Sequence, residues 1–494
     1  MAFELRIFGR ELLRTGRPAA GQAPTIIRAF GDADTGRLYQ DWRLDYGYTA
    51  TETASELPRM RGRCRALVKD NPYAKKWLWL LVANIVGDEG MTLDVQSKDP
   101  KGGIDTVANR ELERQFHLWG ENPDWCDMAG RKNYIQHQQA AMRGIGRDGE
   151  YVIQMVSGVP GNPYSFALKA HRVDALDVTY NEQDTGRGTS ILNGVEIDSW
   201  GRPVRYWFRK NGKAAYMPGG HMTGDRVAIS ADNIIHPFFE EQEDQTRGFP
   251  WLYSALRRLH MLEEYERSEL AAARDCANSL GVYKRSSDPY GQDRDAIAGR
   301  DELEQSLRPS EPGAREVLPE GWDYTHNRPV RPNQAFPDFQ KSMLRGVSAG
   351  GLVHYNTLSN DLEGVSYSSL RDGKLSERDM YKVMQAWFAA KFNRVIYRRW
   401  LLNYLSFHSG TSLPLEKYEK FAEHKWHGRR WPWVDPRNES AARETSRNHG
   451  WTTDRDIAQE MGHDYEQNIE QIKETQRSVK GTYLEASYEN ETDK

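Results

Sequence analysis

The stretch WLYSALRRLHMLEEYERSELAAARDCANSL, residues 251–280, carries the pattern of a long helix. Leucine and alanine recur along it every three or four residues, with Arg and Glu dense between them, which is the spacing of one buried helix face. Six prolines interrupt residues 282–335 and exclude a long helix there. The helical pattern resumes in FPDFQKSMLRGVSA, residues 336–349. We therefore expect two helices joined through a proline-rich inserted module.

Another long helix is expected further along the chain. Residues 374–409 contain no Gly or Pro, and Met, Trp, Val and Leu follow one stripe. At ~1.5 Å per residue such a helix would span about 54 Å, the length of a strut. The preceding stretch, residues 352–370, has no helical pattern and is expected to be a loop. The acidic last part, residues 435–494, predicts one or two polar helices and a frayed tail.

The first half of the chain mixes helices with strands, which indicates an α+β fold. Residues 1–55 have weak periodicity and are expected to form an extended or partly mobile arm. Helical spacing then covers residues 57–86, 104–119 and 134–145. Alternation typical of strands covers residues 151–156, 166–170, 195–198 and 204–209, the last two forming a predicted hairpin.

Composition narrows the class of protein. The 494 residues hold 67 Lys and Arg against 71 Asp and Glu, a formal charge of −4, which excludes a strongly basic nucleic-acid coat. The mean hydropathy of −0.80 is very polar for a long chain. Fifteen Trp nevertheless argue against general disorder. We expect small cores with much polar surface.

The chain shows no targeting or redox signature. Cys64, Cys126 and Cys276 are far apart and predict free, buried thiols in a reducing cytoplasm. The longest apolar run, Trp77–Val86, is too short to span a membrane, so no membrane partner is expected. Charged residues also interrupt the apolar stretch at the N-terminus, which is not typical of a signal peptide.

Two motifs that can mark a ligand site are interpreted as structural. GIGRDG, residues 144–149, matches a dinucleotide fingerprint but follows a helix and precedes a strand, the reverse of the order that places a pyrophosphate at a helix N-terminus. We expect its glycines to end one element and start the next. His424 and His427 could share a helix face and bind a metal, but the Gly and Pro beside them favour a packed knot. No metal, cofactor or catalytic residue is expected.

Two charged clusters leave alternatives open. Glu240, Glu241, Glu243 and Asp244 precede the helix at Trp251. Such carboxylates stabilise the positive end of a helix, the favoured interpretation, but they could also serve acid–base chemistry in a multidomain hydrolase acting on a polymer. A second cluster alternates along the chain and could contact phosphate or form a solvated basic face; its members are Arg59, Arg61, Arg63, Arg65 and Lys69.

Several further motifs occur in a fixed order between residues 57 and 475. They are RCRALVKDNPY (63–73), DGE (148–150), NGVE (193–196), IH (235–236), QTRG (245–248), VLPEG (317–321), LRGVSAG (344–350), YSSLR (367–371) and WVDP (433–436). In this order the chain resembles the lambda-type family of phage portal proteins. It departs from the family at Gly346, where alanine is usual, and at Leu352-Val353-His354, where a Gly-Val-Pro-like step is usual.

The resemblance implies a portal fold with a mixed α/β wing, paired stem helices, a clip insertion, a long wing-crossing helix and a helical crown. The implied boundaries are an N-terminal arm (1–55), the wing (56–250), the first stem helix (251–281), the clip (282–335), the second stem helix (336–350), the channel-loop region (351–373), the long helix with a return to the wing (374–434), and the crown with its acidic tail (435–494).

The resemblance also implies a non-enzymatic ring, expected to be a dodecamer, at one vertex of the virion capsid. Double-stranded DNA would pass through it during packaging and ejection. The implied partners are the terminase large subunit, the major capsid and scaffold proteins, and head-completion or tail connector proteins, with assembly in the host bacterial cytoplasm. The residues implied to face the channel are His354, Tyr355, Asn356, Thr357, Leu358, Ser359, Asn360 and Asp361. Possible phosphate contacts are Arg61, Arg63, Arg65 and Lys69.

Overall fold

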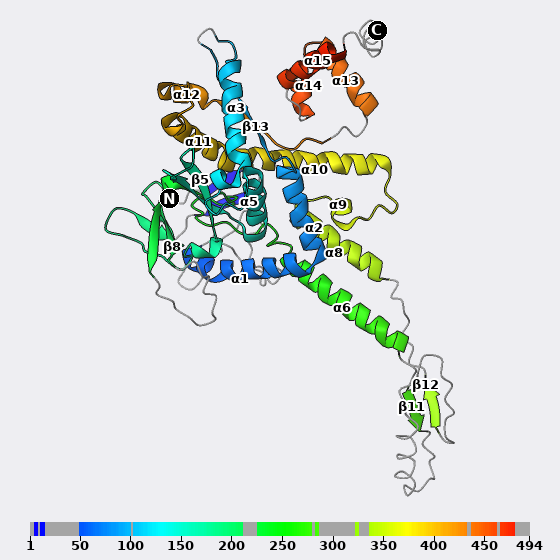
Figure 1. Ribbon diagram of the computed structural model, residues 1–494. Coiled ribbons are helices and arrows are strands. Elements are labelled where there is room, and N and C mark those ends of the chain that lie inside the picture. Colours follow the sequence, from blue (N-terminus) through cyan, green and yellow to red (C-terminus); the bar gives the residue numbers. More distant parts are fainter. Residues whose placement is uncertain are drawn as a thin grey trace, which may run out of the picture. The chain divides into compact units, whose positions relative to one another are not determined.

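The computed structural model describes residues 4–7, 10–14, 49–99, 102–210, 225–278, 282–285, 322–325, 335–431, 436–461 and 465–479 (Figure 1). The chain divides into two units, Met1–Tyr48 and Thr49–Lys494. In the first unit, β1 (Glu4–Ile7) and β2 (Arg10–Arg14) form an antiparallel hairpin. Residues 15–48, 286–321 and 480–494 lie outside the described residues, and with them much of the expected arm, clip and tail.

Side-chain caps define the first two helices of the second unit. α1 (Ala50–Asp70) begins at a capping box, in which Oγ1 of Thr49 accepts a hydrogen bond from the amide of Glu52 at 3.2 Å. Asn71 follows α1 and caps α2 (Pro72–Leu81), since its Oδ1 accepts from the amides that open α2. Pro72 suits this first helical position because no N–H is needed there. The chain therefore turns at Asn71, and a π-helical turn (Val82–Val86) extends α2.

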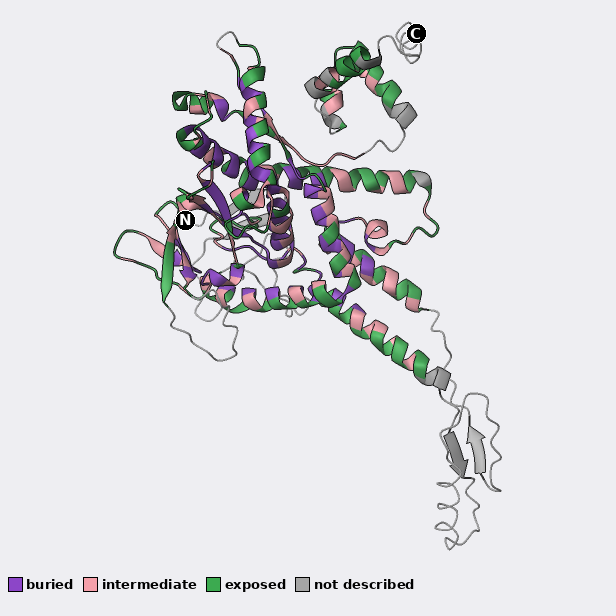
Figure 2. Cartoon of the chain, viewed as in Figure 1, coloured by how far each residue is buried: buried purple, intermediate pink, exposed green. Residues whose placement is uncertain are grey.

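A core rich in aromatic rings holds α2, α3 (Thr106–Glu121), α5 (Tyr134–Asp148) and α11 (Arg394–Phe407) together, and its buried residues appear purple in Figure 2. Trp77, Trp119 and Trp400 are each no more than 1% exposed. The indole N–H of Trp119 donates to the carbonyl oxygen of Phe166 at 3.0 Å. The tryptophans of this polar chain thus supply much of its core, because each large ring buries much apolar surface.

The strands form small antiparallel sheets. β4 lies between β5 and β10, β6 to β9 follow one another in a meander, and β3 pairs with β13. β11 and β12, inside the proline-rich stretch, pair with each other. The hairpin predicted around residue 200 is confirmed as β7 and β8. The bounds are β3 Thr92–Val95, β4 Val152–Ser157, β5 Phe166–His171, β6 Ser190–Leu192, β7 Val195–Ile197, β8 Pro203–Arg209, β9 Arg226–Ser230, β10 Ile234–Ile235, β11 Val282–Arg285, β12 Trp322–Thr325 and β13 His424–His427.

Both helices predicted around the proline-rich stretch are confirmed, as α6 (Leu256–Asn278) and α8 (Phe336–Gly350). α6 begins later than its apolar pattern because turn hydrogen bonds, such as that from the amide of Ala255 to the carbonyl of Leu252, occupy the residues after Pro250. The two helices pack against each other through rings: Tyr265 stacks on Phe336 with centroids 5.7 Å apart.

The predicted strut is also helical, and it is longer than expected. α10 (Tyr367–Phe388), a π-helical turn (Ala389–Asn393) and α11 follow without a break. At ~1.5 Å per residue this run is about 60 Å long. It includes Gly373, which the sequence pattern left outside, because the cap at Ser366 starts the helix upstream.

Short helices complete the described part of the chain. They are α4 (Pro123–Cys126), α9 (Tyr355–Ser359), α12 (Tyr418–Phe421), α13 (Pro436–Asn448), α14 (Asp454–Glu460) and α15 (Tyr465–Val479). The last three correct the expectation of one or two C-terminal helices. Among the described residues, no helix combines the length and apolar run needed to cross a membrane.

Candidate functional site

The segment that follows α8 contains a short helix and is not an irregular loop, which corrects the expectation for residues 352–370. Within it, α9 places Leu358 in the core, where it is 1% exposed. The hydroxyl of Thr357 donates to Oε2 of Glu377 on α10 at 2.8 Å, and the amide of His354 donates to the same carboxylate at 3.3 Å. α9 is therefore held against the middle of α10 by both burial and hydrogen bonds.

The end of α9 is tied to α2 and α8, whereas leucines on either side of α9 reach solvent. Lys76 contacts Asn360, and Nζ of Lys341 lies 3.6 Å from Asp361. Leu352 and Leu362 are 49% and 61% exposed. The segment thus has one face bound to the protein and one face available to a partner or a channel.

A glycine of α10 makes room for His354, which directly precedes α9. The ring of His354 lies so close to Gly373 that any Cβ there would overlap it. At the other side, the indole N–H of Trp77 donates to the carbonyl oxygen of Gly351 at 2.8 Å. The end of α8 is therefore tied to the aromatic core, and the segment leaves from a fixed point.

A cluster of buried titratable side chains lies where α1, β4, β10 and residues 239–255, which we call the approach to α6, meet. Glu150 is 0% exposed, and its carboxylate contacts Nη2 of Arg247 at 2.5 Å and Nη2 of Arg61 at 2.7 Å. Nε2 of His236 lies 3.0 Å from the same carboxylate. The amide of Gly248 donates to it at 2.8 Å. We call these four side chains, Glu150, Arg61, Arg247 and His236, the buried ion cluster.

The ion cluster keeps its carboxylate ionised. Burial alone would raise the pKa of Glu150, but the guanidinium groups of Arg247 and Arg61 hold that pKa well below its usual range. Burial lowers the pKa of His236, against the attraction of Glu150, and so favours the neutral imidazole. The role of the Glu150 carboxylate is therefore structural, because its donors surround it and no reactant can reach it.

Two glycines allow the backbones around the ion cluster to touch. Gly149 adopts φ +88° after α5, and a Cβ there would overlap the backbone of Phe249. A Cβ on Gly248 would likewise overlap the carbonyl of Gly149. The approach to α6 is thereby pressed against the start of β4. Of the GIGRDG motif, only Gly149 ends an element; Gly144 and Gly146 lie inside α5, which corrects the expectation for those two.

The alternating arginines of α1 divide between the inside and the outside of the fold. Arg61 is 2% exposed and donates to the carbonyl oxygens of Asp148 and Gly248. Nε of Arg65 lies 2.7 Å from Asp148, and its two Nη atoms bind Asp174. The expected phosphate contact is therefore wrong for Arg61, which solvent does not reach, and Arg65 is occupied by two carboxylates.

On the outer side of α1, Arg63 and Lys69 are exposed, as is Arg59. None of the three forms an ion pair with any described residue. They stay open to a phosphate or to an acidic protein surface.

The carboxylates before α6 are dispersed on an exposed turn. Nζ of Lys391 lies 3.0 Å from Glu240, and the Tyr253 hydroxyl donates to Glu241 at 3.2 Å. Glu243 and Asp244 are exposed. This arrangement does not bring two carboxylates to one enclosed point.

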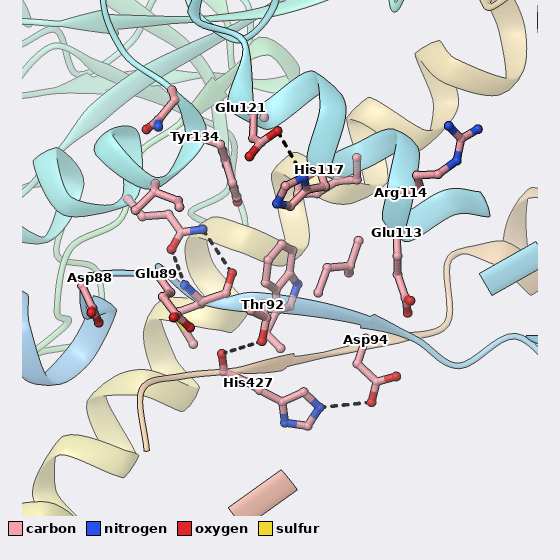
Figure 3. A pocket seen from close by; sticks show the side chains of 18 of the residues that line it. Asp88, Glu89, Thr92, Asp94, Glu113, Arg114, His117, Glu121, Tyr134 and His427 are labelled. Carbon is pink, nitrogen blue, oxygen red and sulfur yellow. Dashed lines mark hydrogen bonds and ion pairs between the residues drawn. The ribbon is translucent and has the colours of Figure 1, made fainter. Parts of the chain in front are cut away.

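The histidine pair belongs to a strand and not to a helix. On β13, side chains at i and i+3 point to opposite faces, so His424 and His427 cannot share a metal as a helix pair could. His427 lies 3.0 Å from Asp94 at the edge of a pocket of about 770 Å³ (Figure 3). Some charged groups of this pocket pair with each other, as do His117 and Glu121 at 3.5 Å, whereas Asp88 and Glu89 are exposed at its edge. Among the described residues, no three potential metal ligands gather.

The buried ion cluster is the feature that sequence reasoning missed. Its residues come from the motifs RCRALVKDNPY, DGE, IH and QTRG or their immediate neighbours. Glu150 and Arg247 are 97 positions apart, so no local pattern links them. The available signal was the presence of charged residues in or beside these motifs with no opposite charge at a neighbouring position.

Comparison with known proteins places the chain among portal proteins. Residues 35–385 match the family model described as phage portal protein, lambda family. The chain is 30% identical over 473 residues to a probable portal protein of Halomonas phage phiHAP-1, covering 93% of this chain and 88% of the relative. It is 24% identical over 348 residues to portal protein B of Escherichia phage lambda, covering 64% of each. A chain from the neck of an empty gene transfer agent particle matches with a TM-score of 0.45 and 14% identity, over 87% of this chain and 99% of the other.

Proposed function

This chain belongs to the lambda family of phage portal proteins, and from that premise we propose that it forms a ring, expected to be a dodecamer, at one capsid vertex, through which double-stranded DNA is packaged and ejected. The observation that carries the proposal is the family match over residues 35–385 together with 30% identity to the probable portal protein of Halomonas phage phiHAP-1 over 93% of this chain.

The family is structural and not catalytic, so the chain is not an enzyme. This overturns the alternative of a polymer-acting hydrolase built on Glu240, Glu241, Glu243 and Asp244. The dispersed, exposed placement of that cluster agrees with the correction.

We further propose that α6 and α8 form the stem and that residues 351–366 line the channel. Support comes from the packing of α6 on α8 and from the exit of the segment at the end of α8. The exposed side of the segment would face DNA, whereas Leu358 is its anchor in the protein. Of the proposed channel residues, His354 to Asp361, Asn360 is exposed and would face the bore, whereas Asp361 is held by Lys341 of α8.

Net charge suits a conduit. Duplex DNA carries about one negative charge per ~1.7 Å, and many fixed phosphate contacts would hold it in place. A chain with a formal charge of −4 offers weak contacts that DNA can exchange as it moves. We propose that the terminase large subunit docks on the clip, residues 282–335. Major capsid, scaffold and head-completion proteins would bind elsewhere, and assembly would take place in the bacterial cytoplasm.

Electron microscopy of the purified protein tests the ring. The expected result is closed particles with a central hole, and mass photometry should give the mass of about twelve copies. A stable monomer at micromolar concentration under several buffer conditions would overturn the proposal.

A deletion in the segment after α8 tests its place in the channel. Removing Asn356–Leu362 should leave rings but impair packaging or retention of DNA. The deletion also removes the buried Leu358 and could disturb the fold. The milder change Leu362→Ser avoids this, because the side chain of Leu362 is 61% exposed. Loss of rings in both variants would assign the segment a structural role instead.

A further inference from the structure

An exposed aromatic patch lies where the approach to α6 meets α10. The rings of Phe239, Trp251 and Trp387 contact one another, with centroids 5.8 to 6.2 Å apart. Met380 and Val383 precede Trp387 by seven and four positions, so they continue the same side of α10. We call these five residues the aromatic patch.

The aromatic patch is open to solvent in the single chain. Phe239, Met380 and Val383 are 45%, 39% and 62% exposed. The indole nitrogen of Trp251 is buried, yet it has no hydrogen-bond partner among the described residues. Clustered aromatic side chains of this kind are common anchors of protein interfaces.

Carboxylates border the patch on one side. Phe239 is followed directly by Glu240, Glu241, Glu243 and Asp244. Of these carboxylates, Glu240 pairs with Lys391. Glu243 and Asp244 are exposed and form no ion pair with any described residue, so they leave this border acidic. A partner surface that matches the aromatic patch would therefore carry basic residues. It would also have small side chains, which leave room for the protruding rings and Val383.

The middle of the outward side of α1, from Arg59 to Lys69, has both properties, while its exposed acidic residues lie toward the two ends of the helix. Its exposed residues include Arg59, Arg63 and Lys69, with Gly62 and Ala66 between them. Nothing lies within 4 Å of the position that a Cβ on Gly62 would occupy. A glycine inside a helix is destabilising relative to alanine, and no contact within the described chain accounts for this one.

A protein surface suits this side of α1 better than a polyanion does. Its exposed basic residues are matched in number by exposed acidic ones at the two ends of the helix, Glu52, Glu56 and Asp70. A duplex would meet this mixed charge along its length and be partly repelled. The acidic border of the aromatic patch is small enough to contact the basic residues around Arg63 without reaching the acidic residues at the ends of α1.

We propose that the aromatic patch and its acidic border on one copy dock on the outward side of α1, around Arg63, of a second copy of this chain. The contact rests on the proposed ring function. It joins two different surfaces, so each copy can bind one neighbour by its patch and the next by its α1, and repetition of this contact can close a ring.

A charge exchange tests the contact in the full-length protein. Glu243→Lys and Arg63→Glu should each raise the protein concentration needed for half-maximal ring assembly at least about tenfold, and the double variant should restore it to within about threefold. Val383→Asp should weaken assembly as well. Mass photometry over a dilution series measures all of these.

Two controls separate the possible outcomes. Glu416→Lys and Val107→Asp change exposed residues outside both surfaces and should leave assembly unchanged. If the wild-type protein forms rings and the variants assemble like it, the contact is wrong while the proposed function stands. If Arg63→Glu lowers only the affinity of rings for DNA, α1 binds phosphate and the inference is overturned.

Discussion

Arg247 and Glu150 form an ion pair in which both side chains are 0% exposed, and this pair connects the approach to α6 with the start of β4. The same guanidinium donates to the carbonyl oxygen of Asn193 at 2.9 Å. The orientation of the proposed stem relative to the sheets thus depends on a contact without access to water. Such pairs contribute little net stability but are costly to break from one side, because an uncompensated charge is left buried.

Replacing Arg247 by Met should therefore destabilise the fold strongly. We expect a loss of about 3 kcal/mol in the free energy of unfolding, at the lower end of the usual range because Arg61 still faces Glu150. The free energy of unfolding of Arg247→Lys should lie between those of wild type and Arg247→Met, since an ammonium group keeps the charge but cannot make the same forked contacts. Urea titration followed by tryptophan fluorescence measures both. The matched control Arg257→Met, at an exposed position of α6, should change the free energy by less than about 0.5 kcal/mol; equal losses would contradict the argument.

Gly149 should tolerate no side chain. Gly149→Ala combines a left-handed φ of +88° with overlap against the Phe249 backbone. The control Gly158→Ala has a similar φ of +78° but no atom within 4 Å of the new Cβ. We expect about 1 kcal/mol for the control and at least about 3 kcal/mol for Gly149→Ala, measured by the same titration. Similar losses for the two variants would show that the backbones are not pressed together.

The buried imidazole of His137 should make the stability of the fold depend on pH. Its side chain is 0% exposed and lies 3.4 Å from Asp127, and burial lowers its pKa to about 4, against the attraction of Asp127. The unfolded chain takes up this proton near pH ~6.5. Between those two values the unfolded state binds more protons than the folded state, so stability falls as pH falls, by on the order of 3 kcal/mol in all.

The non-titrating variant His137→Gln isolates that contribution. Its free energy of unfolding should change less steeply from pH 6.5 to 4.5, by about 1.4 kcal/mol per pH unit relative to wild type. Glu150 cannot produce this difference, since its pKa lies well below its usual range and its stabilisation is lost only in stronger acid. An unchanged slope in the variant would place a charged imidazole in the folded protein.

Local patterns predicted the helices, and long-range contacts account for what they missed. The spacing of Leu in residues 251–280 and the Gly- and Pro-free stretch 374–409 predicted α6 and the α10 to α11 run correctly, because each helix buries one face along its own length. The alternation of Arg along α1 was harder to interpret. Residues two apart on a helix point away from each other, so Arg61 turns inward while Arg63 turns outward.

The partners of Arg61 could not be found in this way. Glu150 lies 89 positions further along the chain, and only the folding of β4 beside α1 brings the two together. Residues 352–370 were mistaken for a loop for a related reason: α9 has only five residues and is held by Glu377 of α10, a contact outside its own sequence.

Gly346 offers a test of the packing of α6 on α8. A Cβ at this position would overlap the guanidinium of Arg258 on α6. Arg258 is exposed, so its side chain can move into solvent at little cost. Gly346→Ala should then stabilise the protein by up to about 1 kcal/mol, the usual gain from glycine to alanine inside a helix.

Gly350→Ala is the matched control at the end of the same helix. There the new Cβ would meet the Cβ of Ala255 at 3.3 Å and the hydroxyl of Ser254 at 2.8 Å. Ala255 is 0% exposed and cannot move aside, so this variant should be destabilised. Thermal melts of both variants at one protein concentration decide the matter. A loss of stability in Gly346→Ala as large as that in Gly350→Ala would mean that Arg258 is fixed in place, and that it, and not the apolar contacts alone, sets the distance between the two helices.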